Sequence, residues 1–400
     1  MWKKEFLTML LIFLTTVFAS AQTVTKTEFA TGEIIEKVEI PNSGKQSFAL
    51  YLPNNYNVLQ KFPVLFCFDP LARGKTAVEH FRVAAEQYGY LVIASNNSQN
   101  AMDGTTLSKI ILALWNDAHK RFSIDEKRVY VAGFSGGARV AAGFAAYCKG
   151  CVFGVIGSGG GFPTGLRVSS QIPFVYFGAV GFDDYNYTEM RNLAKELEKS
   201  QRLYRIETFD GRHQWLDETR AKEALAWFEI LAMRDGRREK DEKFIEDFFR
   251  LQTAQAETFL SEKNYLEAFQ TLRRIVSDFS LWRDVSKYES SLKTLQYSAE
   301  LKNAIEEEDR QFRRQREIVA EIVKLGTTLL YSEERDETLR QIRQIVRVLQ
   351  KKSEEKTDSA ERRIARRSLN HVFAETVEAA VFRYERGGKL EATAGKFEEA

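Results

Sequence analysis

The sequence predicts an α/β fold, with an eight-stranded, mostly parallel sheet followed by a smaller all-α region of helical hairpins. Two observations lead to this prediction. Between about residues 33 and 233, short apolar runs rich in β-branched residues alternate with segments whose apolar residues recur at helical spacing. Beyond residue 236 the chain has almost no β-branched run and no proline, which is typical of a helical region.

The expected strands and helices follow one another in a regular order. The first two strands have no helix between them, so we expect an antiparallel start that leads into a βαβ series. The strands are expected at Glu33–Ile40, Gln46–Leu52, Pro63–Phe68, Tyr90–Ser95, Arg128–Ala132, Phe153–Gly157, Pro173–Gly178 and Tyr204–Phe209. The helices are expected at Lys75–Tyr88, Thr105–Phe122, Gly136–Tyr147, Thr188–Ser200 and Thr219–Met233.

The first residues have the features of a secretory signal peptide. Lys3 and Lys4 precede the apolar run Phe6–Phe18, and the small residues Ala19-Ser20-Ala21 follow it. We therefore expect cleavage before Gln22 and a secreted or periplasmic protein. Threonines interrupt the run, which makes it a poor membrane anchor, since an anchor needs about 18 apolar residues. No second stretch of that length occurs, so no membrane span is expected after cleavage.

The length of 400 residues allows two domains, at roughly 100 to 200 residues per domain. We divide the chain into a signal peptide at 1–21, an α/β domain at 22–235 and an all-α region at 236–400. In this last region, apolar residues at helical spacing flank the turn Glu262-Lys263-Asn264, and the two short helices resemble one tetratricopeptide-like hairpin. The resemblance implies a surface for a protein partner or for the neighbouring domain.

The charge balance does not favour nucleic acid or an anionic membrane. The chain has 58 basic and 56 acidic residues, a formal charge of +2, and the basic residues near Arg362 lie among acidic ones. We expect no nucleic-acid partner. The runs Lys302–Glu317 and Lys351–Arg367 are dense in both charge signs, which predicts solvated helix faces, and we assign them no binding role.

Three cysteines are too few for a disulfide framework. Cys148 and Cys151 form a C-x-x-C pair that would be oxidised in an exported protein. A redox motif or half of a zinc site is the alternative, but Cys67 is the only other thiol. A structural pair or two free thiols is therefore the favoured interpretation, and no metal is expected.

Ser135 is the candidate nucleophile. It lies in Gly133-Phe134-Ser135-Gly136-Gly137, between the expected strand Arg128–Ala132 and the helix that follows. A sharp strand-to-helix turn holds such a serine in a strained conformation, and glycines two residues to either side remove β-carbons that would collide with neighbouring chain. The alternative is an ordinary glycine-rich connection, but the position after the fifth strand favours the nucleophile.

A serine hydroxyl needs a base to remove its proton, and the chain offers four histidines. His80 and His119 lie in expected helices before Ser135, and His371 lies in the all-α region. His213 follows the last expected strand, where a base can reach across the edge of the sheet. His213 is therefore the candidate base, and the alternative is an exposed loop histidine.

The third member of a triad is a carboxylate between the serine and the histidine in sequence, which orients the imidazole. The two candidates are Asp183 and Asp184, which follow the expected strand Pro173–Gly178. We predict that Asp184 orients the base and that Asp183 caps the helix that begins near Thr188.

Attack on an ester creates an oxyanion that needs two preorganised N–H donors. The N–H of Gly136, directly after the serine, is the first candidate. The loop after the third strand supplies the second, and since Pro70 has no N–H, Leu71 is the candidate there.

The serine on its turn, the later aspartate and the late histidine resemble the α/β-hydrolase superfamily over roughly residues 30 to 235. Phe68-Asp69-Pro70, Ser95-Asn96-Asn97-Ser98 and Gly211-Arg212-His213-Gln214-Trp215 are similar to its dienelactone-hydrolase and feruloyl-esterase-like (PHB-depolymerase-like) branch. The chain departs from that branch because it lacks a long insertion between the later strands, where many relatives place a lid, and carries the helical extension.

These features together predict an exported serine esterase that cleaves a small-molecule ester through an acyl-enzyme, without a cofactor or metal. A serine peptidase with the same triad is one alternative. A non-catalytic assembly protein whose helices bind a partner is another. Five aromatic residues near the triad are candidates either for an apolar pocket or for core packing: Phe134, Phe162, Tyr185, Tyr187 and Trp215.

Overall fold

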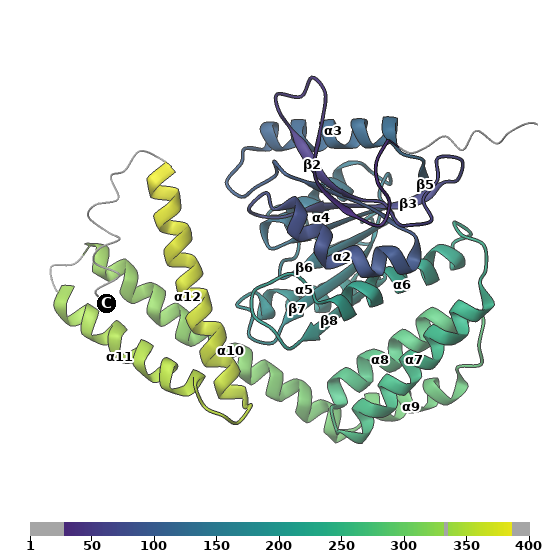
Figure 1. Ribbon diagram of the computed structural model, residues 1–400. Coiled ribbons are helices and arrows are strands. Elements are labelled where there is room, and N and C mark those ends of the chain that lie inside the picture. Colours follow the sequence, from purple (N-terminus) through teal and green to yellow (C-terminus); the bar gives the residue numbers. More distant parts are fainter. Residues whose placement is uncertain (1–27, 332–334, 386–400) are drawn as a thin grey trace, which may run out of the picture.

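The computed structural model describes residues 28–331 and 335–385 (Figure 1). The predicted signal peptide at 1–21 lies outside these residues and stays a prediction. Every helix of the described residues is too short or too polar to cross a bilayer.

One eight-stranded sheet forms the centre of the described fold, as the sequence predicts. Its strand order is β1-β2-β4-β3-β5-β6-β7-β8. The pairs β1–β2 and β2–β4 are antiparallel, and all the other neighbours pair in parallel. The strands are β1 (Ile34–Glu39), β2 (Ser47–Tyr51), β3 (Phe62–Phe68), β4 (Leu91–Ser95), β5 (Ile124–Phe134), β6 (Gly154–Ser158), β7 (Val175–Gly181) and β8 (Tyr204–Phe209).

Helices cover both faces of the sheet. Helices α2 (Gly74–Tyr88) and α6 (Glu218–Arg234) pack on one face, and α3 (Gly104–Arg121), α4 (Gly136–Tyr147) and α5 (Tyr187–Lys199) pack on the other. Strands β3, β4, β6 and β7 are buried along their whole length, because helices lie on both of their sides. The near-continuous apolar runs in the sequence reflect this double cover.

All the described elements after α6 are helices. α7 and α8 lie side by side and are joined by the turn at 262–264, so the predicted hairpin is present, while its likeness to a tetratricopeptide repeat stays a prediction (Figure 1). The long α10 runs from this first group of helices to a second group that contains α11 and α12. The helices are α7 (Glu242–Ser261), α8 (Tyr265–Phe279), α9 (Ser286–Gln296), α10 (Ala299–Tyr331), α11 (Arg335–Ser353) and α12 (Ala360–Glu385).

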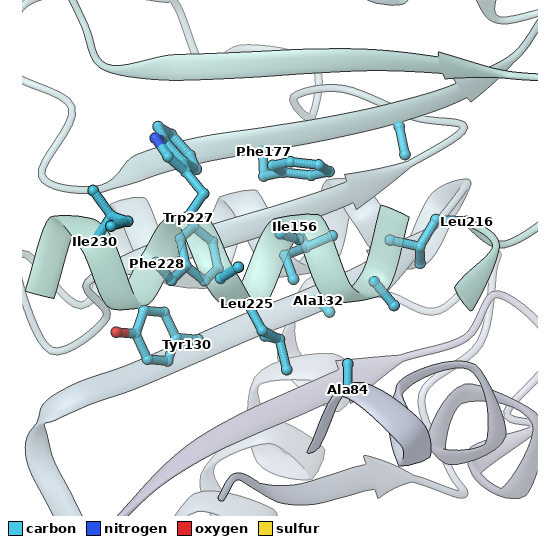
Figure 2. Close-up of a cluster of buried hydrophobic side chains, with 14 of the residues drawn as sticks. Ala84, Tyr130, Ala132, Ile156, Phe177, Leu216, Leu225, Trp227, Phe228 and Ile230 are labelled. Atoms are coloured by element: carbon cyan, nitrogen blue, oxygen red, sulfur yellow. The ribbon is translucent and has the colours of Figure 1, made fainter. Parts of the chain in front are cut away.

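Helix α6 is buried between the sheet and the helical region. Every residue from Ala224 to Met233 is buried. On the sheet side, the Phe228 ring stacks on Tyr130 with 4.7 Å between ring centroids (Figure 2). On the other side, Trp227 Nε1 donates a hydrogen bond to Asp278 of α8 at 3.1 Å. A helix that is buried all round belongs to a core, so one hydrophobic core extends across the predicted domain boundary near 236.

Helix α8 covers β8, the last strand of the sheet. Arg205 of β8 donates to Asp278 Oδ2 at 2.6 Å. Arg274 of α8 donates to Glu207 Oε1 at 2.6 Å and to the Ile206 carbonyl at 3.0 Å. Buried charges need partners, and so do the free backbone groups of an edge strand. These contacts pair the buried charges and one backbone carbonyl of β8, and they join the helical region to the sheet.

The prediction that both charged runs are solvated helix faces is wrong in part. In Lys302–Glu317, Glu308 accepts a hydrogen bond from buried Arg191 of α5 at 2.9 Å. In Lys351–Arg367, Arg367 is only 2% exposed. Each run mixes solvated charges with charges that pair across the interface to the α/β part, and local charge density does not separate the two kinds.

Candidate active site

Ser135 lies on the sharp turn between β5 and α4. Its backbone has φ 53° and ψ −119°, a conformation that a residue with a side chain rarely adopts. A β-carbon on Gly133 would lie 2.0 Å from the carbonyl oxygen of Gly137, and one on Gly137 would lie 2.0 Å from that of Phe68. The prediction that both glycines are needed for close backbone approach is confirmed.

The structure brings the side chains of Ser135, His213 and Asp184 into one chain of hydrogen bonds. The His213 Nε2 atom lies 2.9 Å from Ser135 Oγ, and Nδ1 lies 2.9 and 3.0 Å from the two carboxylate oxygens of Asp184. Since a carboxylate only accepts, the imidazole proton sits on Nδ1, and Nε2 accepts from the serine hydroxyl. The arrangement can take a proton from Ser135 and stabilise the resulting imidazolium.

Asp184 is completely buried, and this burial affects the pKa of its carboxyl group. Burial raises the pKa of the Asp184 carboxyl above its ordinary value, against the hydrogen bond from His213 and that from the Asn186 N–H. The ionised form of Asp184 therefore depends on its contact with the imidazole. A small displacement of either group weakens this support.

Asp183 points away from the triad, and its predicted role as a helix cap is wrong. Its Oδ2 accepts a hydrogen bond from Arg366 Nη1 of α12 at 2.7 Å. The N-cap residue of α5 is Asn186, and no side chain caps that helix. Asp183 faces the helical region, so its carboxylate pairs with Arg366 of α12 and does not cap α5.

The two predicted oxyanion donors, the N–H groups of Gly136 and Leu71, differ in whether another group already accepts from them. The N–H of Gly136 is the first of α4, and the first N–H groups of a helix have no partner within it. The Leu71 prediction is wrong, because its N–H donates to Asp69 Oδ1 at 2.9 Å. Aspartate side chains commonly bond the N–H two residues on, and this local turn takes up the donor.

Asn100, which the sequence analysis did not single out, lies beside Gly136. A β-carbon on Gly136 would lie 1.8 Å from Asn100 Oδ1 and 3.2 Å from Nδ2, so the side-chain amide packs against this residue. The Asn100 N–H donates to the Pro70 carbonyl at 2.8 Å, which ties the loop after β4 to the loop after β3. The polar run Ser95-Asn96-Asn97-Ser98, at the end of the fourth strand, is the sequence signal that indicates this loop.

Asp69 ties the loop after β3 to the loop of the base. It is 1% exposed and accepts hydrogen bonds from Trp215 Nε1 at 2.8 Å and Arg73 Nε at 2.9 Å. Burial alone would raise the pKa of Asp69, but the hydrogen bonds from Arg73 and Trp215 outweigh it, so the pKa lies below its ordinary value. Because Trp215 follows His213 by two residues, this anchored carboxylate helps to hold the base.

The candidate pocket aromatics divide between the core and the base. Trp215, Phe134 and Tyr187 are buried in the core. Phe134 and Tyr185 flank the imidazole, with their ring centroids 4.7 and 4.2 Å from that of His213. Phe162 packs against Phe174 and Tyr176, on the face of the sheet that α3, α4 and α5 cover.

Two of the three cysteines are bonded to each other. Cys148 and Cys151 form a disulfide at the end of α4, and Cys67 is free and buried in β3. Within residues 28–331 and 335–385, no group of three or more His, Cys, Asp or Glu side chains is placed to hold a metal ion.

We predict that Gly137→Ala lowers the free energy of unfolding by about 1 to 3 kcal/mol, because the new methyl group meets the Phe68 backbone. Gly143→Ala in the same helix is the control, since its β-carbon would lie 3.4 Å from Pro163 and alanine favours a helix. Urea denaturation of both variants measures the difference. Equal stability would show that the backbone contact at Gly137 imposes no constraint.

The sheet order, the antiparallel start and the serine turn between β5 and α4 make the α/β part an α/β-hydrolase fold. No protein-family model matches the chain, and no curated protein matches it in sequence. Solved structures similar to it include S-formylglutathione hydrolase from Staphylococcus aureus, at 15% identity over 50% of this chain and 98% of that one, with TM-score 0.41. A fluorophosphonate-binding serine hydrolase of the same organism has 17% identity, 50% and 99% coverage and TM-score 0.42. Est1E from Butyrivibrio proteoclasticus has 13% identity, 48% and 99% coverage and TM-score 0.40.

Proposed function

We propose that the protein is a serine esterase that cleaves a carboxylic ester through an acyl-enzyme on Ser135. The observation that carries the proposal is the hydrogen-bond chain from Ser135 through His213 to Asp184, on a strained strand-to-helix turn. A general base at hydrogen-bond distance from a serine hydroxyl is what nucleophilic attack requires.

The reaction runs in two halves. In the first, Ser135 Oγ attacks the ester carbonyl carbon while His213 Nε2 takes the hydroxyl proton, and the imidazolium then gives that proton to the departing alcohol. In the second, a water attacks the acyl group, His213 takes its proton, and the acid leaves as Ser135 regains its hydrogen. Asp184 accepts from Nδ1 throughout and stabilises the charged imidazole.

The oxyanion of each tetrahedral intermediate needs hydrogen-bond donors close to Ser135. The Gly136 N–H is one, at the positive end of the α4 dipole. Since the Leu71 N–H donates to Asp69, we assign the second donor to the Nδ2 group of Asn100, whose side-chain amide lies against Gly136. Side-chain amides serve this purpose in other acyl-transfer sites.

The first test uses a fluorophosphonate probe and short-chain aryl esters. The wild-type protein should be labelled at Ser135, and Ser135→Ala should lose both labelling and about 10³-fold or more in kcat. Asp184→Asn should lower kcat by about 10³- to 10⁴-fold, because the imidazole loses the acceptor that orients it.

Asp210→Asn is the matched control, since Asp210 is an exposed carboxylate in the loop of the base. Its kcat should equal that of the wild type. A folded wild-type protein that the probe does not label would refute the proposal. Peptide anilides assayed in parallel distinguish an esterase from a peptidase with the same triad.

The second test concerns the oxyanion donor. Asn100→Ala should lower kcat by about 10²-fold with little change in KM, because the lost donor acts only when negative charge develops. Gln99→Ala changes the neighbouring exposed side chain and should leave kcat unaltered. Equal kcat values for the two variants would remove Asn100 from the oxyanion site.

We further propose that the protein acts outside the cytoplasm. The basic and apolar residues at 3–18 support export, and the Cys148–Cys151 disulfide agrees with an oxidising compartment. Mass spectrometry of the protein from the periplasm or medium should give a chain that begins at Gln22. An intact leader on a protein retained in the cytoplasm would contradict export.

A further inference from the structure

Helix α12 contacts the segment that carries Asp184. We call residues 182–186, between β7 and α5, the acid loop. Arg367 Nη1 donates to the Phe182 carbonyl at 2.9 Å, and Asn370 Nδ2 donates to the Asp183 carbonyl at 3.1 Å. Arg366 Nη1 donates to the Asp183 carboxylate at 2.7 Å. Three side chains of one helix therefore hold the two residues directly before Asp184.

The arginines that reach the acid loop are themselves held in place. Arg367 is 2% exposed, and its Nε donates to Gln315 Oε1 of α10 at 2.7 Å. Arg366 Nε donates to the Ser353 carbonyl at the end of α11 at 3.0 Å. The guanidinium of Arg363 lies 4.0 Å from the centre of the Phe182 ring. Helices α10 and α11 thus orient the side chains of Arg367 and Arg366.

The opposite side of the acid loop faces the loop of the base. The Phe182 N–H donates to the Phe209 carbonyl at 2.9 Å, and the Asp183 N–H donates to the Gly211 carbonyl at 3.0 Å. The N–H groups of these two residues therefore point to the side of His213, and their carbonyl groups point to α12. The acid loop lies between the two.

A second contact connects α12 to the base through an aromatic ring. Tyr185, also in the acid loop, lies 4.2 Å from the His213 ring on one side and 6.0 Å from the His371 ring of α12 on the other, between ring centroids. The imidazole and its carboxylate partner thus both rest on a loop that α12 supports.

We propose that α12 is part of the active site, and that Arg366, Arg367 and Asn370 are positioning residues that set the geometry between Asp184 and His213. This inference rests on the proposed function. The Nδ1 atom contacts both Asp184 oxygens within 3.0 Å, and a displacement of about 1 Å in a catalytic group can cost about 10²-fold in rate. The helical extension then holds the acid loop of the α/β part in place from a position far along the chain.

The test compares Arg366→Met and Asn370→Leu with wild type in aryl-ester hydrolysis by the full chain. Each variant should lower kcat by about 10-fold with KM changed by less than about 2-fold, because the triad shifts while the substrate surface stays. Arg366→Lys keeps the charge beside Asp183 and should recover most of kcat. Arg367 is left unchanged, since its burial makes loss of folding the expected result.

Lys195→Met is the matched control. Its ion pair with Asp309 at 2.8 Å also joins the α/β part to the helical region, but it does not touch the acid loop. Its kcat should equal that of the wild type, and thermal melting should show similar loss of stability for control and test variants. A role in stability alone would lower kcat only in proportion to the folded fraction, and that result would overturn the inference.

A double-mutant cycle tests whether Arg366 influences kcat through its contact with Asp183. If Arg366 acts through Asp183, Asp183→Asn should lower kcat in the wild type and add little in Arg366→Met. Additive effects would overturn this route. Wild-type labelling at Ser135 with unchanged kcat in both α12 variants would refute the inference alone, whereas an unlabelled wild type would refute the proposed function.

Discussion

The strained turn at Ser135 is the constraint on which the rest of the site depends. A positive φ at a serine persists only where the surrounding structure holds it. Here a central parallel strand leads into the turn, and a helix with one buried face leads out of it. The Ser135 N–H also donates to the Ser158 carbonyl of β6 at 2.8 Å. The turn therefore lies at the edge where the carboxyl ends of the parallel strands meet, and the loops after β7 and β8 bring the acid and the base to the same edge.

The helical region is bound into this architecture rather than appended to it. Helix α6 is buried on the sheet side and on the side of α7 and α8, so neither part has a complete core without the other. The buried pair of Arg205 with Asp278 adds a further requirement, because removal of one partner leaves the other in the interior without its opposite charge. Helices far along the chain therefore contact the loop that carries Asp184.

Much of the fold and the candidate triad could be predicted because their signals are local. Strand burial on both faces leaves continuous apolar runs, and the serine turn leaves glycines at 133 and 137. His213 was identified by elimination among four histidines. The Leu71 prediction is wrong for a reason that is also local, since the Asp69 side chain competes for the same N–H. The sequence pattern that indicates this competition is weaker than the glycine pattern of the serine turn.

The sequence by itself determined the fold class, the succession of strands and helices along the chain and the residue types of the candidate triad, since periodicity and turn chemistry depend on neighbours along the chain. Only the tertiary structure decided the partners of Asp183, Arg366 and Arg367. Asp183 and Arg366 are 183 positions apart, and a run of mixed charges has the same appearance whether it faces water or a carboxylate of another element. The support of the acid loop by α12 arises from packing between distant segments, which no local spacing records.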